Sequence, residues 1–216
     1  MILEIDNVEL YFKHKRILNG IYLKAETGRV TGILGRNGSG KSCLMDIIFG
    51  NLKPKYKLLR LDNTPILKPL YQSHLVSYLP QYDFIPKSFK LKSIFKFYNV
   101  DWGIFSEIFT EFHNFHNTKI GKLSGGERRC IEIYVTLQSQ KPIILLDEPF
   151  NGISPLMVEH IKSLIAVSKK EKIIILSDHR YNDVLEISDQ IYVLNNGSTT
   201  LIKNRTDLED YGYLST

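Results

Sequence analysis

The sequence of 216 residues contains only two cysteines and no long hydrophobic run. Cys43 and Cys130 cannot form a disulfide framework, and neither stands in a Cys-x-x-Cys or Cys/His cluster of the kind that binds zinc. No stretch approaches the roughly 18 consecutive apolar residues that a membrane-spanning helix requires. These absences exclude disulfide-rich, zinc-ribbon and membrane-spanning proteins.

The N-terminus lacks the basic and then apolar pattern of a secretory signal, because it contains Glu4, Asp6 and Glu9. We therefore expect a cytoplasmic protein. Its 43% hydrophobic content is sufficient for a packed core and excludes a disordered chain. The net charge of +5 permits a nucleotide, a nucleic acid or an anionic membrane as partner, without distinguishing among them.

The sequence has no internal repeat, no Ser/Gly linker and no heptad pattern, which favours one compact unit. Apolar residues alternate over residues 2–5, 8–12 and 21–25, a pattern typical of short strands. The pairs Asn19-Gly20 and Thr27-Gly28 are candidate turns between them. This region is predicted to form an antiparallel β flap.

Three continuous apolar runs, at residues 30–34, 143–146 and 173–176, are typical of strands buried on both faces of a parallel sheet. Helical segments separate these runs, so the fold class is predicted to be α/β with a mostly parallel sheet. A β-hairpin is expected at residues 191–202, around the turn Asn195-Asn196-Gly197.

Residues 82–122 differ in composition from the rest of the chain, since they hold eight of the 11 phenylalanines and the only tryptophan. Phe105, Phe109 and Phe112 follow the i, i+4, i+7 spacing of one helix face. We interpret these rings as core packing, with an aromatic surface for a partner helix as the alternative. The segment is predicted to be a small α-helical subdomain.

A phosphate-binding loop, here called the P-loop, is predicted at residues 35–42, Gly-Arg-Asn-Gly-Ser-Gly-Lys-Ser. It follows an apolar strand and precedes a helical run, as such loops do. Its glycines let the backbone wrap a triphosphate, Lys41 neutralises β/γ charge and the Ser42 hydroxyl can reach Mg²⁺. The expected nucleotide contacts in this region are Gly35, Asn37, Gly38, Ser39, Gly40, Lys41, Ser42 and Cys43.

Two carboxylates end the apolar run at 143–146, namely Asp147 and Glu148. Alternation along a strand would direct them to opposite sides. One of them is therefore expected in a Mg²⁺ shell, and the other is expected to act on an attacking water as general base.

The segment Leu123-Ser124-Gly125-Gly126-Glu127, called here the signature segment, resembles the signature of ABC transporter nucleotide-binding subunits. Three further positions fit the same family. Gln81, in Tyr78-Leu79-Pro80-Gln81, resembles its Q-loop glutamine, His179 resembles its switch histidine, and Phe12 resembles the aromatic residue that stacks on adenine.

The resemblance implies a P-loop NTPase (RecA-like) core at residues 1–81 and 123–216, with the helical subdomain at 82–122. It implies an ATPase in which two chains pack head to tail and each ATP lies between the P-loop of one and the signature segment of the other. Nucleotide contacts are then expected from Phe12, Ser124, Gly125 and Gly126. Catalytic roles fall to Glu148, His179, Lys41 and Gln81, and metal contacts to Ser42, Gln81 and Asp147.

The partners that the resemblance implies are a second copy of the chain, ATP, Mg²⁺ and a separate membrane permease. The permease would dock near Gln81 and residues 82–122 and hold the protein at the inner face of the membrane; no nucleic acid is expected. Residues 123–129, Glu132 and 147–150 look most like the branch serving lipopolysaccharide export and branched-chain amino acid uptake. One departure is Ser154, where the family usually has Asp.

Two alternatives remain open. A soluble ABC-type ATPase could act on DNA or ribosomes, but the sequence has no coiled-coil insertion, zinc module or second cassette of the kind such proteins carry. A small-molecule P-loop kinase would leave the signature segment unexplained.

Overall fold

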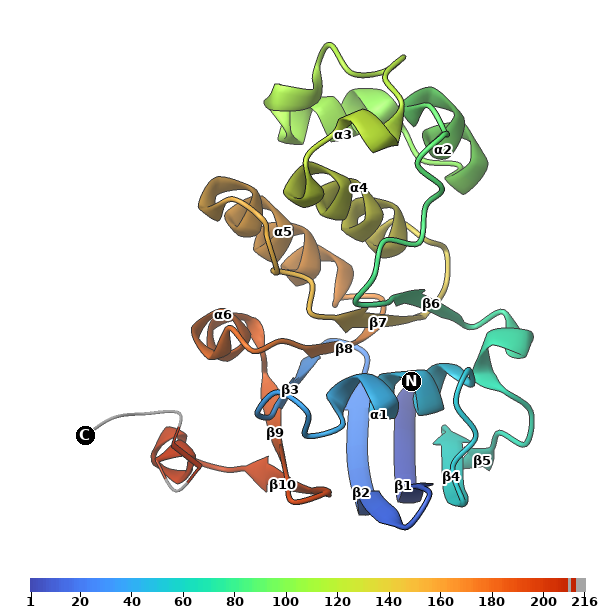
Figure 1. Cartoon of the computed structure of the whole chain (residues 1–216), viewed down its shortest axis with the longest axis vertical. Helices are drawn as coiled ribbons and strands as arrows, with labels where there is room; N and C mark the ends of the chain where they lie inside the picture. The colour runs from blue at the N-terminus through green and yellow to red at the C-terminus, as the bar shows by residue number, and fades with distance from the viewer. Residues whose placement is uncertain (210, 213–216) are drawn as a thin grey trace.

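The computed structural model describes residues 1–209 and 211–212 and contains two β-sheets with helices around them (Figure 1). One sheet is antiparallel, with strand order β2-β1-β4-β5, and the other is mainly parallel, with order β10-β9-β3-β8-β7-β6. The strands are β1 Ile2–Phe12, β2 Lys15–Glu26, β3 Val30–Leu34, β4 Tyr56–Leu61, β5 Thr64–Pro65, β6 Val76–Leu79, β7 Ile143–Asp147, β8 Ile173–Ser177, β9 Gln190–Asn195 and β10 Ser198–Ile202. The α-helices are α1 Lys41–Phe49, α2 Leu91–Tyr98, α3 Trp102–Ile108, α4 Gly125–Leu137, α5 Pro155–Ser168 and α6 Tyr181–Ile187, and short 3-10 turns lie at Leu70–Ser73, Thr110–Phe112, Ile120–Lys122 and Arg205–Leu208.

The three predicted parallel strands are present as β3, β7 and β8, and every residue of each is buried. They pair in parallel, as their continuous apolar runs predicted. The hairpin expected around Asn195-Asn196-Gly197 is also present, since β9 and β10 pair antiparallel across it. The α/β prediction is therefore confirmed.

The antiparallel flap is present, but one of its predicted turns is wrong. The turn between β1 and β2 lies at Lys13-His14, and Asn19-Gly20 lies inside β2. The backbone N–H of Asn19 donates to the carbonyl of Gly197 at 2.7 Å, so this part of β2 packs on the distant β9–β10 hairpin. That long-range contact overrides the local turn preference of an Asn-Gly pair. The predicted turn at Thr27-Gly28 is present between β2 and β3.

The parallel sheet separates two hydrophobic cores. Residues 144, 146, 174 and 176 face helices α4, α5 and α6, whereas residues 143, 145, 173 and 175 face α1 and the antiparallel sheet. Figure 1 shows these layers on opposite sides of β7 and β8. Within the described residues, no helix is both long and apolar enough to cross a lipid bilayer.

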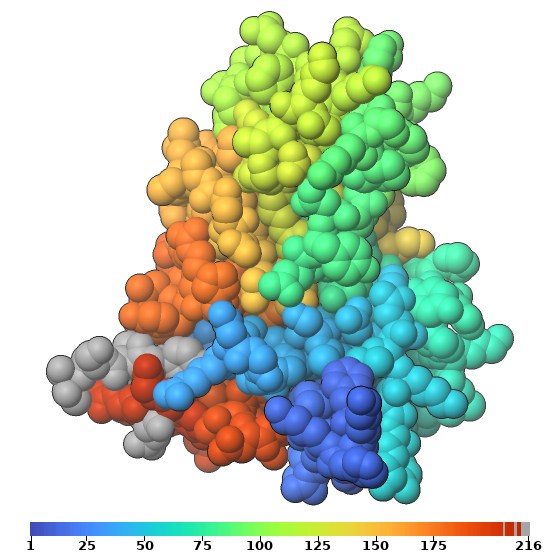
Figure 2. Space-filling model, viewed as in Figure 1, coloured from blue at the N-terminus to red at the C-terminus, as the bar shows by residue number. Residues whose placement is uncertain are grey.

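The aromatic segment at residues 82–122 packs on α4 and forms one end of the molecule (Figure 2). Phe105, Phe109 and Phe112 are each 0% exposed, so the core-packing interpretation is correct. The continuous helix implied by their spacing is wrong, because α3 ends at Ile108 and Phe109 leaves helical geometry with φ −113° and ψ 77°. The ring of Phe105 lies 4.9 Å from that of Tyr134 on α4.

The division into residues 1–81, 82–122 and 123–216 stays a prediction, and residues 210 and 213–216 of the last part lie outside the described residues.

Candidate functional site

The P-loop joins the end of β3 to the start of α1, as its sequence predicted. Gly40 precedes α1 with φ 105°, a conformation that favours glycine. At Gly35 a Cβ would lie 2.5 Å from Oγ of Ser39 and 2.9 Å from the carbonyl oxygen of Leu194. Both positions therefore need a residue without a side chain for the loop to close.

Lys41 is the first residue of α1 and is only 5% exposed. Its Nζ donates hydrogen bonds to the carbonyl oxygens of Gly35 at 2.7 Å and Arg36 at 3.4 Å, so the side chain folds back along the loop. Burial lowers the pKa of Lys41, and the nearby carboxylates of Glu148, Asp147 and Asp178 oppose that shift. The ammonium group is thus placed where a phosphate would offset its loss of hydration.

Asp147 ends β7 and is 1% exposed. Ser177, on the neighbouring strand β8, donates a short hydrogen bond to its Oδ1. Its Oδ2 is buried and has no hydrogen-bond partner among the described residues. An unpaired carboxylate oxygen in a buried position is a suitable ligand for a hard cation.

Glu148 adopts a left-handed backbone conformation with φ 48°, so the strand ends before it. The orientation of its side chain therefore comes from this turn and not from strand alternation, which corrects the argument made from sequence. Its Oε2 accepts a 2.9 Å hydrogen bond from Nε2 of Gln81 and lies 3.6 Å from Nδ1 of His179. Three predicted catalytic side chains, from different parts of the chain, thus meet at one oxygen.

Asp178 is a residue of this site that sequence reasoning missed. It is 0% exposed and accepts hydrogen bonds from the backbone N–H of Phe150 at 3.0 Å and of Arg180 at 2.9 Å. Its Oδ1 lies 3.4 Å from Nδ1 of His179. The only signal in the sequence was its place between a buried strand and His179.

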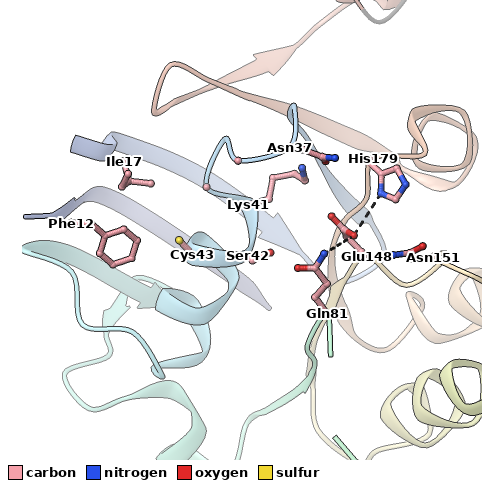
Figure 3. A pocket seen from close by; sticks show the side chains of 12 residues that line it. Phe12, Ile17, Asn37, Lys41, Ser42, Cys43, Gln81, Glu148, Asn151 and His179 are labelled. Carbon is pink, nitrogen blue, oxygen red and sulfur yellow. Dashed lines mark hydrogen bonds and ion pairs between the residues drawn. The ribbon is translucent and has the colours of Figure 1, made fainter. Parts of the chain in front are cut away.

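A cleft of about 660 Å³ brings these elements together (Figure 3). Phe12 and Lys41 contribute from the side of the flap and α1, and Glu148 and His179 from the opposite side. The cleft is lined by Phe12, Ile17, Asn37, Gly38, Gly40, Lys41, Ser42, Cys43, Gln81, Glu148, Asn151 and His179. Ile17 and Asn151 are lining residues that the sequence did not reveal. Phe12 is 49% exposed, so its ring is open to a flat ligand.

The signature segment begins α4, and none of its residues lines this cleft. Ser124 caps the helix in a reciprocal arrangement, since its Oγ accepts from the N–H of Glu127 and its own N–H donates to Glu127 at 2.7 Å. A Cβ on Gly126 would stand 2.3 Å from the carbonyl oxygen of Gly152. Ser154, which stands where the family usually has Asp, caps α5 by accepting from the N–H of Met157.

The family model that describes ABC transporters matches residues 18–151. The chain therefore belongs to the ABC transporter family. It is an ATP-binding subunit of that family and an ATPase.

Curated relatives agree with this assignment. The chain is 28% identical to the lipopolysaccharide export system ATP-binding protein LptB of Escherichia coli, over 88% of this chain and 86% of the relative. It is 28% identical to the probable branched-chain amino acid transport ATP-binding protein LivG of Methanocaldococcus jannaschii, over 91% and 87%. It is 25% identical to the Nod factor export ATP-binding protein I of Burkholderia lata, over 90% and 68%. The expected likeness to the lipopolysaccharide and branched-chain amino acid branch is thus confirmed.

Solved structures agree on the fold. One described as the ATP-binding subunit of an ABC transporter superposes with a TM-score of 0.82 at 18% identity, over 98% of this chain and 94% of that chain. A bacterial Atm1-family ABC exporter with ATP bound gives 0.83 at 22% identity, over 98% of this chain and 40% of the exporter. The prediction of a P-loop ATPase core with a mostly parallel sheet is confirmed.

Proposed function

We propose that the chain powers a separate membrane permease by closing as a head-to-tail homodimer around two ATP molecules and reopening after hydrolysis. The observation that carries this proposal is the cleft in which Lys41, Gln81, Glu148 and His179 converge. Attack by water on a γ-phosphate requires a lysine that binds the phosphates and a carboxylate held beside an amide and an imidazole.

Nucleotide binding is assigned to the flap and the P-loop. Phe12 stacks on adenine, and Lys41 releases its carbonyl contacts to bind β/γ-phosphate oxygens. The backbone N–H groups of the P-loop and the start of α1 donate to the same phosphates. Neutralisation of the triphosphate by these groups lowers the energy of the transition state, in which negative charge is spread over the γ-phosphoryl oxygens.

A magnesium ion fits the oxygen groups beside this cleft. Ser42 offers a hydroxyl, Gln81 an amide oxygen, and Asp147 the buried Oδ2 that lacks a partner among the described residues. Such an ion would supply positive charge that offsets the negative charge of the triphosphate. Ser177 fixes the Asp147 carboxylate, because it holds the other oxygen.

Glu148 is assigned the role of general base. It would accept a proton from the attacking water, and Gln81 and His179 would hold that water and the γ-phosphate in line. Asp178 would fix the position of the histidine, since its carboxylate lies 3.4 Å from Nδ1. Glu148 is only 8% exposed, so few water molecules other than the attacking one can reach its carboxylate.

The dimer is proposed because the signature segment does not line the cleft of its own chain. Ser124, Gly125 and the first N–H groups of α4 form a second anion-binding surface at a helix start. In a head-to-tail pair this surface would cover the γ-phosphate bound by the other chain. Each of the two sites would then be complete.

The permease is expected to dock beside Gln81, on the surface of the 82–122 segment. Several large apolar side chains are exposed there, including Tyr82 at 67%, Phe89 at 50% and Phe97 at 80%. Burial of such rings supplies energy for association. The protein would then sit at the cytoplasmic face of the membrane. The relatives named above are transport ATP-binding proteins, which disfavours the DNA and ribosome alternative.

The test uses a Glu148→Gln variant, which keeps the shape of the base but cannot accept the proton. We expect it to bind ATP with Mg²⁺, to turn over about 100-fold or more slowly than wild type, and to accumulate as a dimer in light scattering. A Lys41→Ala variant is the control that should neither bind ATP nor dimerise. Turnover of Glu148→Gln near the wild-type rate would refute the base assignment.

The permease is tested with the same trapped variant. It is tagged, given ATP and Mg²⁺, and isolated from detergent-solubilised membranes of its source cells, with Lys41→Ala processed in parallel. A polytopic membrane protein in stoichiometric amount, identified by mass spectrometry only with Glu148→Gln, supports the transport role. Ribosomal or DNA-associated proteins in its place would favour the soluble alternative.

A further inference from the structure

Arg129 lies in the first half of α4, five positions after Ser124, and its guanidinium is buried with the residue 5% exposed. Its Nη1 donates to the carbonyl oxygen of Pro80 at 2.6 Å. Its Nη2 donates to the carbonyl oxygens of Asp147 at 2.5 Å and Glu148 at 3.2 Å. One side chain therefore joins the signature helix to the backbone on either side of the proposed base and to the peptide group that leads into Gln81.

Glu132 lies one turn further along α4 and binds the far end of the segment 80–85, whose first residue is held by Arg129. It is 0% exposed, and its Oε1 accepts hydrogen bonds from the backbone N–H of Phe84 at 2.8 Å and of Ile85 at 2.9 Å. Its Oε2 lies 3.8 Å from Nη1 of Arg129. The two buried charges thus offset each other, and together they fasten residues 80–85 to α4 at both ends.

Stabilisation of the fold does not by itself explain why Arg129 and Glu132 are buried as an ion pair. A buried ion pair often contributes no more stability than apolar side chains of the same volume. All three acceptors of Arg129 are carbonyls beside residues of the cleft, and Glu148 needs support for its left-handed backbone at φ 48°. The contacts of Arg129 are therefore concentrated where the position of a carboxylate matters.

We propose that Arg129 is a positioning residue for ATP hydrolysis, which sets Glu148 against Gln81 and links both to the signature helix. This inference rests on the function proposed above. Ser124 caps the same helix, so Arg129 joins the helix that carries the signature segment to the base and to the residue before Gln81 in its own chain.

Lys162 provides a matched control. It is a cation of similar burial, 7% exposed, and it bonds Glu159 at 2.9 Å, Asp183 at 2.9 Å and Glu186 at 2.6 Å. These partners lie on α5 and α6, away from the cleft. Lys162→Met therefore measures the cost of removing a buried cation without touching the proposed base.

The experiment compares wild type, Arg129→Lys, Arg129→Met and Lys162→Met as full chains, with thermal unfolding, ATP affinity, kcat and KM measured for each. We expect both Arg129 variants to bind ATP within about threefold of wild type and to lose about 10-fold to 100-fold in kcat. Lysine cannot reproduce a fork that reaches three carbonyls. Arg129→Lys keeps the buried charge and carries the test if Arg129→Met fails to fold.

Addition of Glu148→Gln separates positioning from packing. If Arg129 acts through Glu148, Arg129→Lys in a Glu148→Gln background should lower the remaining rate no further. An unchanged kcat in Arg129→Lys would overturn this inference and leave the proposed function standing. The same holds if Lys162→Met loses as much kcat as Arg129→Lys does, at an equal loss of thermal stability. Wild-type turnover by the single Glu148→Gln variant would refute the base itself, and the inference would fall with it.

Discussion

Nε2 of Gln81 donates a hydrogen bond of 2.9 Å to Oε2 of Glu148. The two residues stand at the ends of neighbouring parallel strands, where β6 and β7 pair Leu79 with Leu146. Each side chain lies two residues beyond that last pair, so the register of the sheet brings them together. The proposed metal ligand and the proposed base are thus in direct contact.

A Gln81→Glu substitution tests this contact. It places a second carboxylate against Glu148, where like charges repel, and we expect kcat to fall by about 10-fold or more while ATP affinity changes little. Steady-state ATPase assays and equilibrium binding of labelled ATP measure the two effects. The control is Gln81→Ala, which removes the contact without adding charge and should cost less. Equal kcat values in Gln81→Glu and wild type would contradict the pairing.

The lowered pKa of Lys41 predicts a pH dependence of ATP binding. Only the protonated lysine attracts phosphate, so ATP affinity should fall as the pH rises through this lowered value, below the ordinary 10.5. Between this lowered pKa and 10.5, Lys41 keeps its proton in the unfolded chain but loses it in the folded protein. The contribution of Lys41 to the free energy of unfolding of the nucleotide-free protein therefore rises with pH.

Calorimetric titration with ATP across the alkaline range, together with urea unfolding, measures the two opposite slopes that the Lys41 prediction requires. Lys41→Arg is the control, since a guanidinium stays charged throughout. Its ATP affinity should be flat with pH whatever its absolute value. A wild-type affinity that rises with pH would contradict the expected sign.

Ser124→Arg tests the head-to-tail dimer. A bulky cation at the start of α4 should leave ATP binding by the single chain unchanged, because Ser124 does not line its own cleft. It should block closure on the other chain, so dimer formation with ATP in the Glu148→Gln background should disappear in light scattering. Loss of ATP binding by the monomer would show that the signature segment serves its own site.

Substitution of Gly126 or of its neighbour Gly125 by alanine gives a matched pair of variants that tests a close backbone contact through protein stability. A Cβ on Gly126 would meet the carbonyl oxygen of Gly152 at 2.3 Å. Among the described residues, the contact of a Cβ on Gly125 is Nη2 of Arg128 at 4.0 Å. Gly126→Ala should lower the free energy of unfolding by about 1–3 kcal/mol through overpacking. Gly125→Ala should leave it unchanged within about 0.5 kcal/mol. Similar melting temperatures for the two variants would refute the close contact.

Phe105 and Phe97 make a second pair, within the aromatic segment. Phe105 is 0% exposed and packs on Phe95 and Tyr134 at ring distances of 4.9 Å each, so Phe105→Ala should cost about 3–5 kcal/mol. Phe97 is 80% exposed, and Phe97→Ala should leave stability unchanged while weakening permease capture. Chemical denaturation measures the first effect, and recovery of the permease with the tagged protein measures the second. A stable Phe105→Ala protein would contradict the packing.

Much of the fold could be predicted from sequence because buried parallel strands leave an uninterrupted apolar pattern, as in β3, β7 and β8. The turn at Asn19-Gly20 could not, since the backbone of Asn19 is satisfied by Gly197, far away in the chain. The end of α3 was also missed. All three rings are buried although Phe109 lies outside helical geometry, so the helical spacing of the rings did not establish a continuous helix.

The candidate site was predictable where it is built from short motifs, as at the P-loop and Glu148. The contacts of Asp178 and Arg129 were not, because their partners are backbone groups brought close only by the fold: Phe150 for Asp178, and Pro80 and Glu148 for Arg129. A backbone N–H donor or carbonyl acceptor carries no mark in the sequence. Such supporting residues therefore emerge from the structure alone.

The parallel sheet also bears on how proteins of this kind can evolve. Its strands divide the interior into one core shared by α4, α5 and the aromatic segment and another shared by α1 and the antiparallel sheet. Because alternate residues of the same strands face the two cores, a side chain in one core lies across the sheet from the side chains of the other. For the docking surface proposed above, selection would reshape side chains of the 82–122 segment on one side of the sheet, while Phe12 and Lys41 belong to elements on the other side.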